Sequence, residues 1–292
     1  MANLLSQKAV IADVVIRRWT GRKLDREVTE ETNSSHKAEA DAGRFNKLLI
    51  SKAAFQEVHR LTSAARQKHY VMTLPWSDAG YRILPTAMYD DFANSFRELK
   101  QEFNKAADTF ARQYPSYVSG AEKRLGRMFK PEDYPDHAKV RGMFSFNVSI
   151  RPCPDADDFR VTLGKEQMED VKSALQADME AALKEAMLEP VRRVVDVVGK
   201  MAIKLKDYKP ATDTGRAENT FRDSLVENVR ELLPLLDAFN LTGDKNITKI
   251  AQRMEKELCK NDADTLREDD DVRKKVQKAA DDILKQANAL MA

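Results

Sequence analysis

The sequence has few residues that interrupt helices or cross-link chains. Its 292 residues include 10 glycines, 10 prolines and 2 cysteines, and aromatic residues make up 7%. So few breakers, beside many Ala, Glu, Lys, Leu and Arg residues, favour long helices. Cys153 and Cys259 form no C-x-x-C pattern. The sequence therefore predicts neither a disulfide framework nor a structural zinc site, and a reducing cytosol is the simplest setting.

Long apolar runs and an excess of one charge are also absent. No run approaches the ~20 apolar residues that span a bilayer, and Asp13, Arg17 and Arg18 interrupt the start of the chain before a signal-peptide core can form. We therefore expect a soluble, cytoplasmic protein without a membrane anchor. The net charge of +2, from 49 basic and 47 acidic residues, is far from that of a dedicated duplex-DNA binder, so any nucleic-acid contact has to come from a local patch.

The common sequence motifs of catalysis and cofactor binding do not occur. There is no G-x-S-x-G, no G-x-x-x-x-G-K-[ST] and no G-x-G-x-x-G, and no i, i+4 pair among the four histidines His36, His59, His69 and His137. Cys153 lies between two prolines in a turn that could expose it, with Arg151 as the cation nearest in sequence. We expect a protein that is not an enzyme and holds no cofactor or metal.

Two acidic runs lack the spaced ligands of a calcium loop. They are Asp155, Asp157 and Asp158, and the run Glu268–Asp271. The first fits a hairpin turn. The second fits the early part of a helix, where the helix dipole stabilises carboxylates.

Apolar residues recur at intervals of three and four in both halves of the chain. The stripe from Tyr89 to Tyr117 predicts a helix of about seven turns, capped by Thr86 and ended or kinked at Pro115. The stripe over 164–207 predicts a second long helix that Pro190 kinks or splits. Further helices are expected over 44–68, after a cap at Thr220, after a cap at Asp244, and as one last helix from Leu266 to Leu290.

Short β-prone runs separate these helices. The runs 70–74 and 81–84 predict one hairpin, and the runs 143–150 and 159–163 predict a second. The stretch 4–19 fits a helix or a strand, and 20–43 a loop or a weakly packed helix. The expected fold is α+β and predominantly α-helical, with long helices and two short β-hairpins. Its expected domains are an N-terminal segment 1–43, a hairpin-containing head 44–163 and a helical tail 164–292.

The best candidates for a contact with a partner lie in the head. Residues 44–68 hold six basic residues against one acid, Glu57, and Trp76 and Tyr81 lie at the turn of the first hairpin. Aromatic side chains among cations suit single-stranded nucleic acid. The tentative contact residues are Arg60, Arg66, Lys68, Trp76, Tyr81 and Arg82. The aromatic stripe from Tyr89 to Tyr117 could also stack bases, but its helical spacing favours a core. The stripe over 164–207 fits either intramolecular packing or an oligomer interface.

Six short segments resemble one known family. They are 19–23 (WTGRK), 80–85 (GYRILP), 134–135 (YP), 152–160 (PCPDADDFR), 221–225 (FRDSL) and 240–244 (NLTGD). Together they resemble the uncharacterised bacteriophage and mobile-element family known as domain of unknown function 3150. The resemblance covers most of the chain and implies a phage or mobile-element origin. It also implies an association with AAA-type ATPases and recombination genes, but it defines no functional residue.

Many helical stripes without a converging polar site indicate a binding protein. The expected function is a non-enzymatic phage or mobile-element accessory protein that forms a homo-oligomer, or binds a partner protein such as an AAA-type ATPase, through long helices. The alternative is a single-stranded DNA-binding or annealing protein of a recombination system. In either case the host cell cytoplasm is the expected location.

Overall fold

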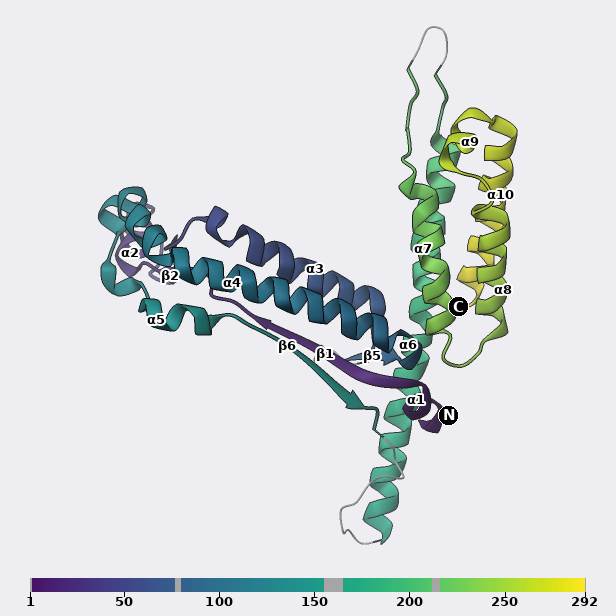
Figure 1. Ribbon diagram of the computed structural model, residues 1–292, viewed down its shortest axis with the longest axis horizontal. Coiled ribbons are helices and arrows are strands. Elements are labelled where there is room, and N and C mark those ends of the chain that lie inside the picture. The colour runs from purple at the N-terminus through teal and green to yellow at the C-terminus, as the bar shows by residue number, and fades with distance from the viewer. Residues whose placement is uncertain (1, 77–79, 155–164, 212–215, 292) are drawn as a thin grey trace. The chain divides into compact units, whose positions relative to one another are not determined.

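The computed structural model describes residues 2–76, 80–154, 165–211 and 216–291. Within them the protein is α+β and predominantly helical, with a four-stranded and a two-stranded sheet (Figure 1). This confirms the predicted fold class.

The chain forms two compact units, each built from stretches that are distant in sequence. Unit 1 contains Met1–Asp13, Met72–Asp90 and Ile150–Ala292, and unit 2 contains Val14–Val71 and Asp91–Ser149. The three domains predicted from the sequence follow one another along the chain, whereas each unit combines early and late segments.

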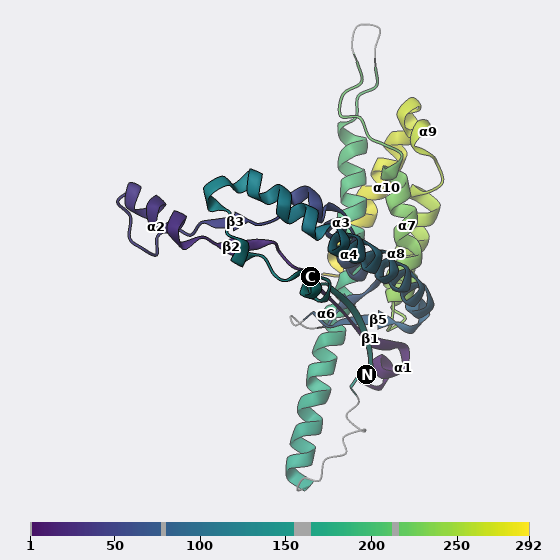
Figure 2. The ribbon, with the colours of Figure 1, turned by 60° about the vertical axis from the view of Figure 1, so that its left-hand side comes forward.

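Unit 1 holds the helices of the second half of the chain. They are α6 (Lys165–Asp207), α7 (Ser224–Phe239), α8 (Lys245–Arg253), the π-helical turn η7 (Met254–Leu258), α9 (Ala263–Glu268) and α10 (Asp270–Ala289). Helices α7 and α10 pack along α6 (Figures 1 and 2). Val198 and Met201 of α6, Leu236 of α7 and Ile283 of α10 are buried in one core. The predicted helix over 164–207 is confirmed, and much of its stripe packs within the chain.

Of the predicted caps and ends of these helices, two are wrong and one is confirmed. Helix α6 passes through Pro190 without splitting, because buried side chains on both sides of the proline hold it in place. Helix α7 begins at Ser224, after Asp223, and Thr220 is exposed before it. The single last helix is divided at Asp269, whose extended backbone ends α9 and whose carboxylate accepts the amides of Asp271 and Val272. The cap at Asp244 is confirmed, since its carboxylate accepts the amide of Asn246.

The four-stranded sheet has the order β4-β5-β1-β6. Strand β1 (Ala9–Arg17) follows the short helix α1 (Ala2–Lys8), so the ambiguous stretch 4–19 contains both kinds of structure. Within unit 1, β1 pairs antiparallel with β5 (Arg82–Pro85), and β5 pairs antiparallel with β4 (Leu74–Pro75). The 3₁₀ helix η2 (Thr86–Met88) follows.

The two predicted hairpins have different outcomes. The first is confirmed as β4 and β5, but residues 70–72 belong to helix α3 because its buried stripe continues to Met72. For the second, β6 (Ser145–Pro152) is a strand as predicted, and its neighbour in the sheet order is β1. Its predicted partner strand, 159–163, lies outside the described residues.

Unit 2 is built around two long helices that lie side by side, α3 (Gln56–Met72) and α4 (Tyr89–Leu125) (Figures 1 and 2). The ring centroids of Phe55 and Phe110 are 4.7 Å apart, and Phe110 also packs on Phe144 at 5.2 Å. From Phe92 to Tyr114 the aromatic stripe of α4 is therefore core, as its spacing favours, whereas Tyr89 is 43% exposed. Helix α4 continues through Pro115 rather than ending there. Thr86 is not its cap, because the Thr86 hydroxyl donates to the Lys8 carbonyl oxygen in unit 1.

Short elements complete unit 2. Strand β2 (Arg22–Leu24) pairs antiparallel with β3 (Asn46–Leu48), and α2 (Arg26–Ser35) begins at its N-cap Asp25. The helix predicted over 44–68 is thus wrong for its first turns, where β3 and the 3₁₀ helix η1 (Lys52–Phe55) lie. The remaining elements are η3 (Gly126–Met128), η4 (Pro131–Asp133), α5 (His137–Val140) and η5 (Arg141–Met143).

Candidate functional site

The six predicted contact residues divide between the two units. Arg60, Arg66 and Lys68 lie on α3 in unit 2, whereas Trp76, Tyr81 and Arg82 belong to unit 1. Neither unit therefore assembles the full set by itself.

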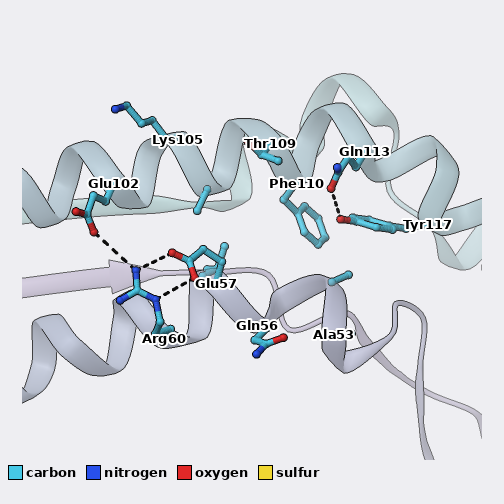
Figure 3. Close-up of a pocket in the computed structure, with 13 residues that line it drawn as sticks. Ala53, Gln56, Glu57, Arg60, Glu102, Lys105, Thr109, Phe110, Gln113 and Tyr117 are labelled. Carbon is cyan, nitrogen blue, oxygen red and sulfur yellow. Dashed lines mark hydrogen bonds and ion pairs between the residues drawn. The ribbon is translucent and has the colours of Figure 1, made fainter.

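Arg60 lies at a groove between α3 and α4 that has a volume of about 670 Å³ (Figure 3). Its guanidinium donates to both carboxylate oxygens of Glu57, at 2.9 and 2.7 Å, and lies 3.8 Å from Glu102 Oε2. The bond from Arg60 lowers the pKa of the Glu57 carboxyl, so this carboxylate stays ionised. Two carboxylates thus offset the charge of Arg60, which makes it a poor ligand for a phosphate.

The other two predicted cations of α3 are exposed but do not share a face with each other. At 3.6 residues per turn, Arg66 lies about 120° around the helix from Arg60 and about 160° from Lys68. Both Arg66 and Lys68 are exposed. A ligand on one side of α3 can meet only one of these two side chains.

The hairpin residues are held by contacts within unit 1. Arg82 donates from Nε to Thr73 Oγ1 at 2.7 Å and from Nη2 to the Thr73 carbonyl oxygen at 3.1 Å. The Arg151 guanidinium lies 5.2 Å from the ring centroid of Tyr81. Trp76 and Tyr81 are half-buried. Arg82 has a structural contact that crosses the hairpin.

Unit 2 contains a buried ionic cluster, which we call the Lys47 cluster and which consists of Lys47, Asp25 and Asp133. Lys47 Nζ lies 2.8 Å from Asp25 Oδ2 and 2.7 Å from Asp133 Oδ2, and it donates to the Met128 carbonyl oxygen at 2.8 Å. The Lys47 and Asp25 side chains are 2% and 3% exposed. Three oxygen atoms thus surround the Lys47 ammonium group, which has three N–H donors.

The charges of the Lys47 cluster are mutually stabilised. The bond from Lys47 lowers the pKa of Asp25. Burial raises the pKa of Asp133, but bonds from Lys23 and Lys47 outweigh it and the net pKa is lowered. Burial likewise lowers the pKa of Lys47, and the two aspartates outweigh it and raise the pKa. A buried lysine that is charged and surrounded by three oxygen atoms suits a structural role, and not that of a nucleophile or a base.

No sequence signal pointed to the Lys47 cluster. Lys47 was one of several basic residues in the stretch 44–68, and Asp25 and Asp133 lie in separate polar segments. Asp25 could be recognised only as a helix cap, because its carboxylate accepts the amide of Val28.

Cys153 and the second acidic run have structural roles. Cys153 is buried, and burial raises the pKa of its thiol to about 11, so the hypothesis of an exposed reactive thiol is wrong. In the second acidic run, Asp269 caps α10 and Asp270 pairs with Lys274 at 2.6 Å. The run 155–158 lies outside the described residues. Within the part of the chain that the structure describes, no three His, Cys, Asp or Glu side chains gather as metal ligands would.

Searches against protein-family models, curated proteins and solved structures find no match to this chain. The resemblance to the phage and mobile-element family therefore stays a prediction. Among the described residues, no helix is both long enough and apolar enough to cross a bilayer.

Proposed function

We propose that the protein is a non-enzymatic assembly protein whose first turns of α6 bind a second copy of the chain. The binding surface is the α6 stripe, which consists of Met168, Val171 and Leu175. On the resemblance described above, we also propose a phage or mobile-element accessory role in the host cytoplasm, with an AAA-type ATPase as a candidate further partner.

One observation supports the α6 stripe as a binding surface. Its spacing of three and four residues continues without a break into Met179 and Leu183, which are 1% and 4% exposed in the core of unit 1. In the stripe itself Val171 is 37% exposed, and Met168 and Leu175 are half-buried. The same apolar face of one helix is thus buried over its later turns and partly solvated at its start. Covering the remainder would add hydrophobic stabilisation.

The residues beside the stripe suit a second copy as the occupant. Asp170 and Lys172 flank Val171 in sequence and carry opposite charges. In a parallel pair of identical helices, a two-fold axis along the pair can set Asp170 of one copy beside Lys172 of the other, as the self-complementary surface of a two-fold interface requires. Two-fold homodimers are also the commonest soluble oligomers.

Light scattering of the full chain tests this proposal. We expect the wild type to have about twice the chain mass of 33.2 kDa, and the variant Val171→Glu/Leu175→Glu to have the mass of one chain. The control, Ser173→Glu/Ala177→Glu, adds the same charge at exposed positions on the other side of the helix and keeps the wild-type mass. A monomeric wild type, or equal masses for the two variants, contradicts the proposal.

Single-stranded nucleic-acid binding is the second candidate function. The specific observation in its favour is that Arg66 lies near a further arginine, Arg18, and that neither forms an ion pair within the described residues. In this respect Arg66 differs from Arg60, which pairs with two glutamates.

A further inference from the structure

We propose that Arg18, Arg22, His59 and Arg66 form a surface in unit 2 that binds the phosphates of a single-stranded nucleic acid. We call this set the arginine patch. It lies on a different face of α3 from Arg60 and does not depend on the proposed self-association through α6.

The residues between Arg18 and Arg22 are anchored on Phe55, the last residue of η1, and on Leu49. The Trp19 ring lies 6.0 Å from the ring of Phe55 in an edge contact. Gly21 has a φ of +60°, and a Cβ atom there would lie 2.7 Å from the Phe55 ring. The Leu49 amide donates to the Gly21 carbonyl oxygen at 2.7 Å. This turn is therefore fixed against Phe55, and the two arginines that flank it are positioned with it.

His59 and Arg66 continue the patch along α3. The His59 ring stacks on Phe55, with centroids 5.7 Å apart and an interplanar angle of 14°. Arg66 follows seven residues later, which is about two turns and about 10 Å along the same side of the helix. His59, Arg22 and Arg66 are exposed, and Arg18 is half-buried.

The charges in the patch act on one another without a carboxylate to offset them. Burial lowers the pKa of His59, and Arg18 and Arg22 lower it further. Burial also lowers the pKa of Arg18, and Arg66 adds to this. Within the described residues, Arg18, Arg22 and Arg66 form no ion pair. Clustered guanidinium groups without counter-charges favour a bound phosphate, which each can contact with two parallel N–H groups.

The shape of the surface favours a single strand over a compact phosphate ligand. The cations extend along α3, and Tyr70 lies four residues after Arg66 on the same side, with 56% of its surface exposed. Exposed aromatic rings beside a cationic track stack the bases of single strands. A phosphopeptide or a lipid surface would use the arginines but would have no bases to stack on Tyr70.

Fluorescence anisotropy with a labelled oligothymidylate tests the proposal on the full chain. The variant Arg18→Gln/Arg22→Gln/Arg66→Gln should bind at least about tenfold more weakly at low salt. Its plot of log K against log salt should lose about two units of slope, because each phosphate contact on a single strand contributes about 0.7. The control, Lys100→Gln/Lys105→Gln/Lys123→Gln, removes the same charge from other exposed positions of unit 2 and should stay within about twofold of wild type. Circular dichroism melts establish that both variants are folded.

Three results would overturn the assignment. The first is that the wild type does not bind at low salt. The second is that the two triple variants lose affinity equally, which would mean that binding depends only on net charge. The third is that sodium polyphosphate, or vesicles of phosphatidylserine and phosphatidylcholine, displace the oligothymidylate as well as an unlabelled oligothymidylate does. That result would assign the patch to polyanions or membranes without a role for bases.

Discussion

Lys47 Nζ lies 2.8 Å from Asp25 Oδ2, with both side chains almost fully buried in unit 2. This pair joins strand β3 to the residue that caps α2, and Asp133 extends it to η4. Charges removed from water in this way are stable only while all partners are present. The Lys47 cluster therefore fixes the small elements that surround the ends of β2 and β3.

Removal of the central cation should strongly destabilise the protein. We expect Lys47→Met to lower the free energy of unfolding by about 3–5 kcal/mol, because it leaves two buried carboxylates without their shared cation. The control is Lys23→Met. Lys23 also pairs with Asp133, at 2.8 Å, but its side chain is 49% exposed, so the loss should be below about 1 kcal/mol. Urea unfolding measures both values, and equal losses would contradict a structural role for Lys47.

The Lys47 cluster should also make stability depend on pH in a defined direction. The pKa values of Asp25 and Asp133 are lowered in the folded state. Their contribution is therefore complete above the unfolded pKa of about 4 and is lost as the pH falls through the lower folded values. The pKa of Lys47 is raised, so its contribution is present below about 10.5 and is lost only as the pH rises through the higher folded value.

The same variant tests this pH dependence. In Lys47→Met the carboxylates have lost the cation that lowers their pKa values, so the stability difference between wild type and variant should shrink on acidification from pH 7 to about 3. Urea unfolding at several pH values measures it. A difference that stays constant over this range would mean that the cluster does not titrate as described.

Gly21 should tolerate no side chain. Its φ of +60° and the 2.7 Å approach of a Cβ atom to the Phe55 ring predict that Gly21→Ala destabilises the protein by about 1–3 kcal/mol. Gly120 is the matched control, because it is exposed within α4 and a Cβ atom there meets nothing within 4 Å. Gly120→Ala should instead stabilise by up to about 1 kcal/mol. Thermal unfolding reports both signs, and a neutral Gly21→Ala would show that the turn is not tightly packed.

Both thiols should react slowly in the folded protein. Burial raises the pKa of Cys153 to about 11 and also raises that of Cys259, so little thiolate is present near pH 8. We expect labelling with a chromogenic disulfide to be slow before unfolding and fast in urea, with half-buried Cys259 reacting before Cys153. If Cys153 reacts in the folded protein as fast as it does in urea, its side chain is not buried as described.

The long helices were predictable because each has a stripe long enough to stand out from its surroundings. The spacing from Phe92 to Tyr114 indicates α4 without any knowledge of what covers it, and packing then carries the helix through Pro115. Strand β3 was missed because three residues cannot establish a period. Its Lys47 is buried only because Asp25 and Asp133, far away in sequence, supply acceptors.

The candidate contact surface was only partly predictable, because the residues that face its cations are distant in sequence. A basic stretch identifies Arg66 and Arg60 alike, but it does not show that Arg60 faces Glu102 on α4 while Arg66 faces Arg18. That distinction depends on how α4 and the segment after β1 lie relative to α3 within unit 2. Composition reports the charges of a segment, and only tertiary contacts show which of them are offset.

Cysteine cross-linking at the start of α6 tests the proposed self-association most directly. In a background with Cys153→Ala and Cys259→Ala, Val171→Cys should form an intermolecular disulfide under mild oxidation, because a bridge requires the two Cα atoms to approach within about 7 Å. Ser173→Cys, on the opposite side of the helix, should form it far more slowly. Equal rates at the two positions, or no linked dimer at Val171→Cys, would contradict a contact between two copies through the α6 stripe.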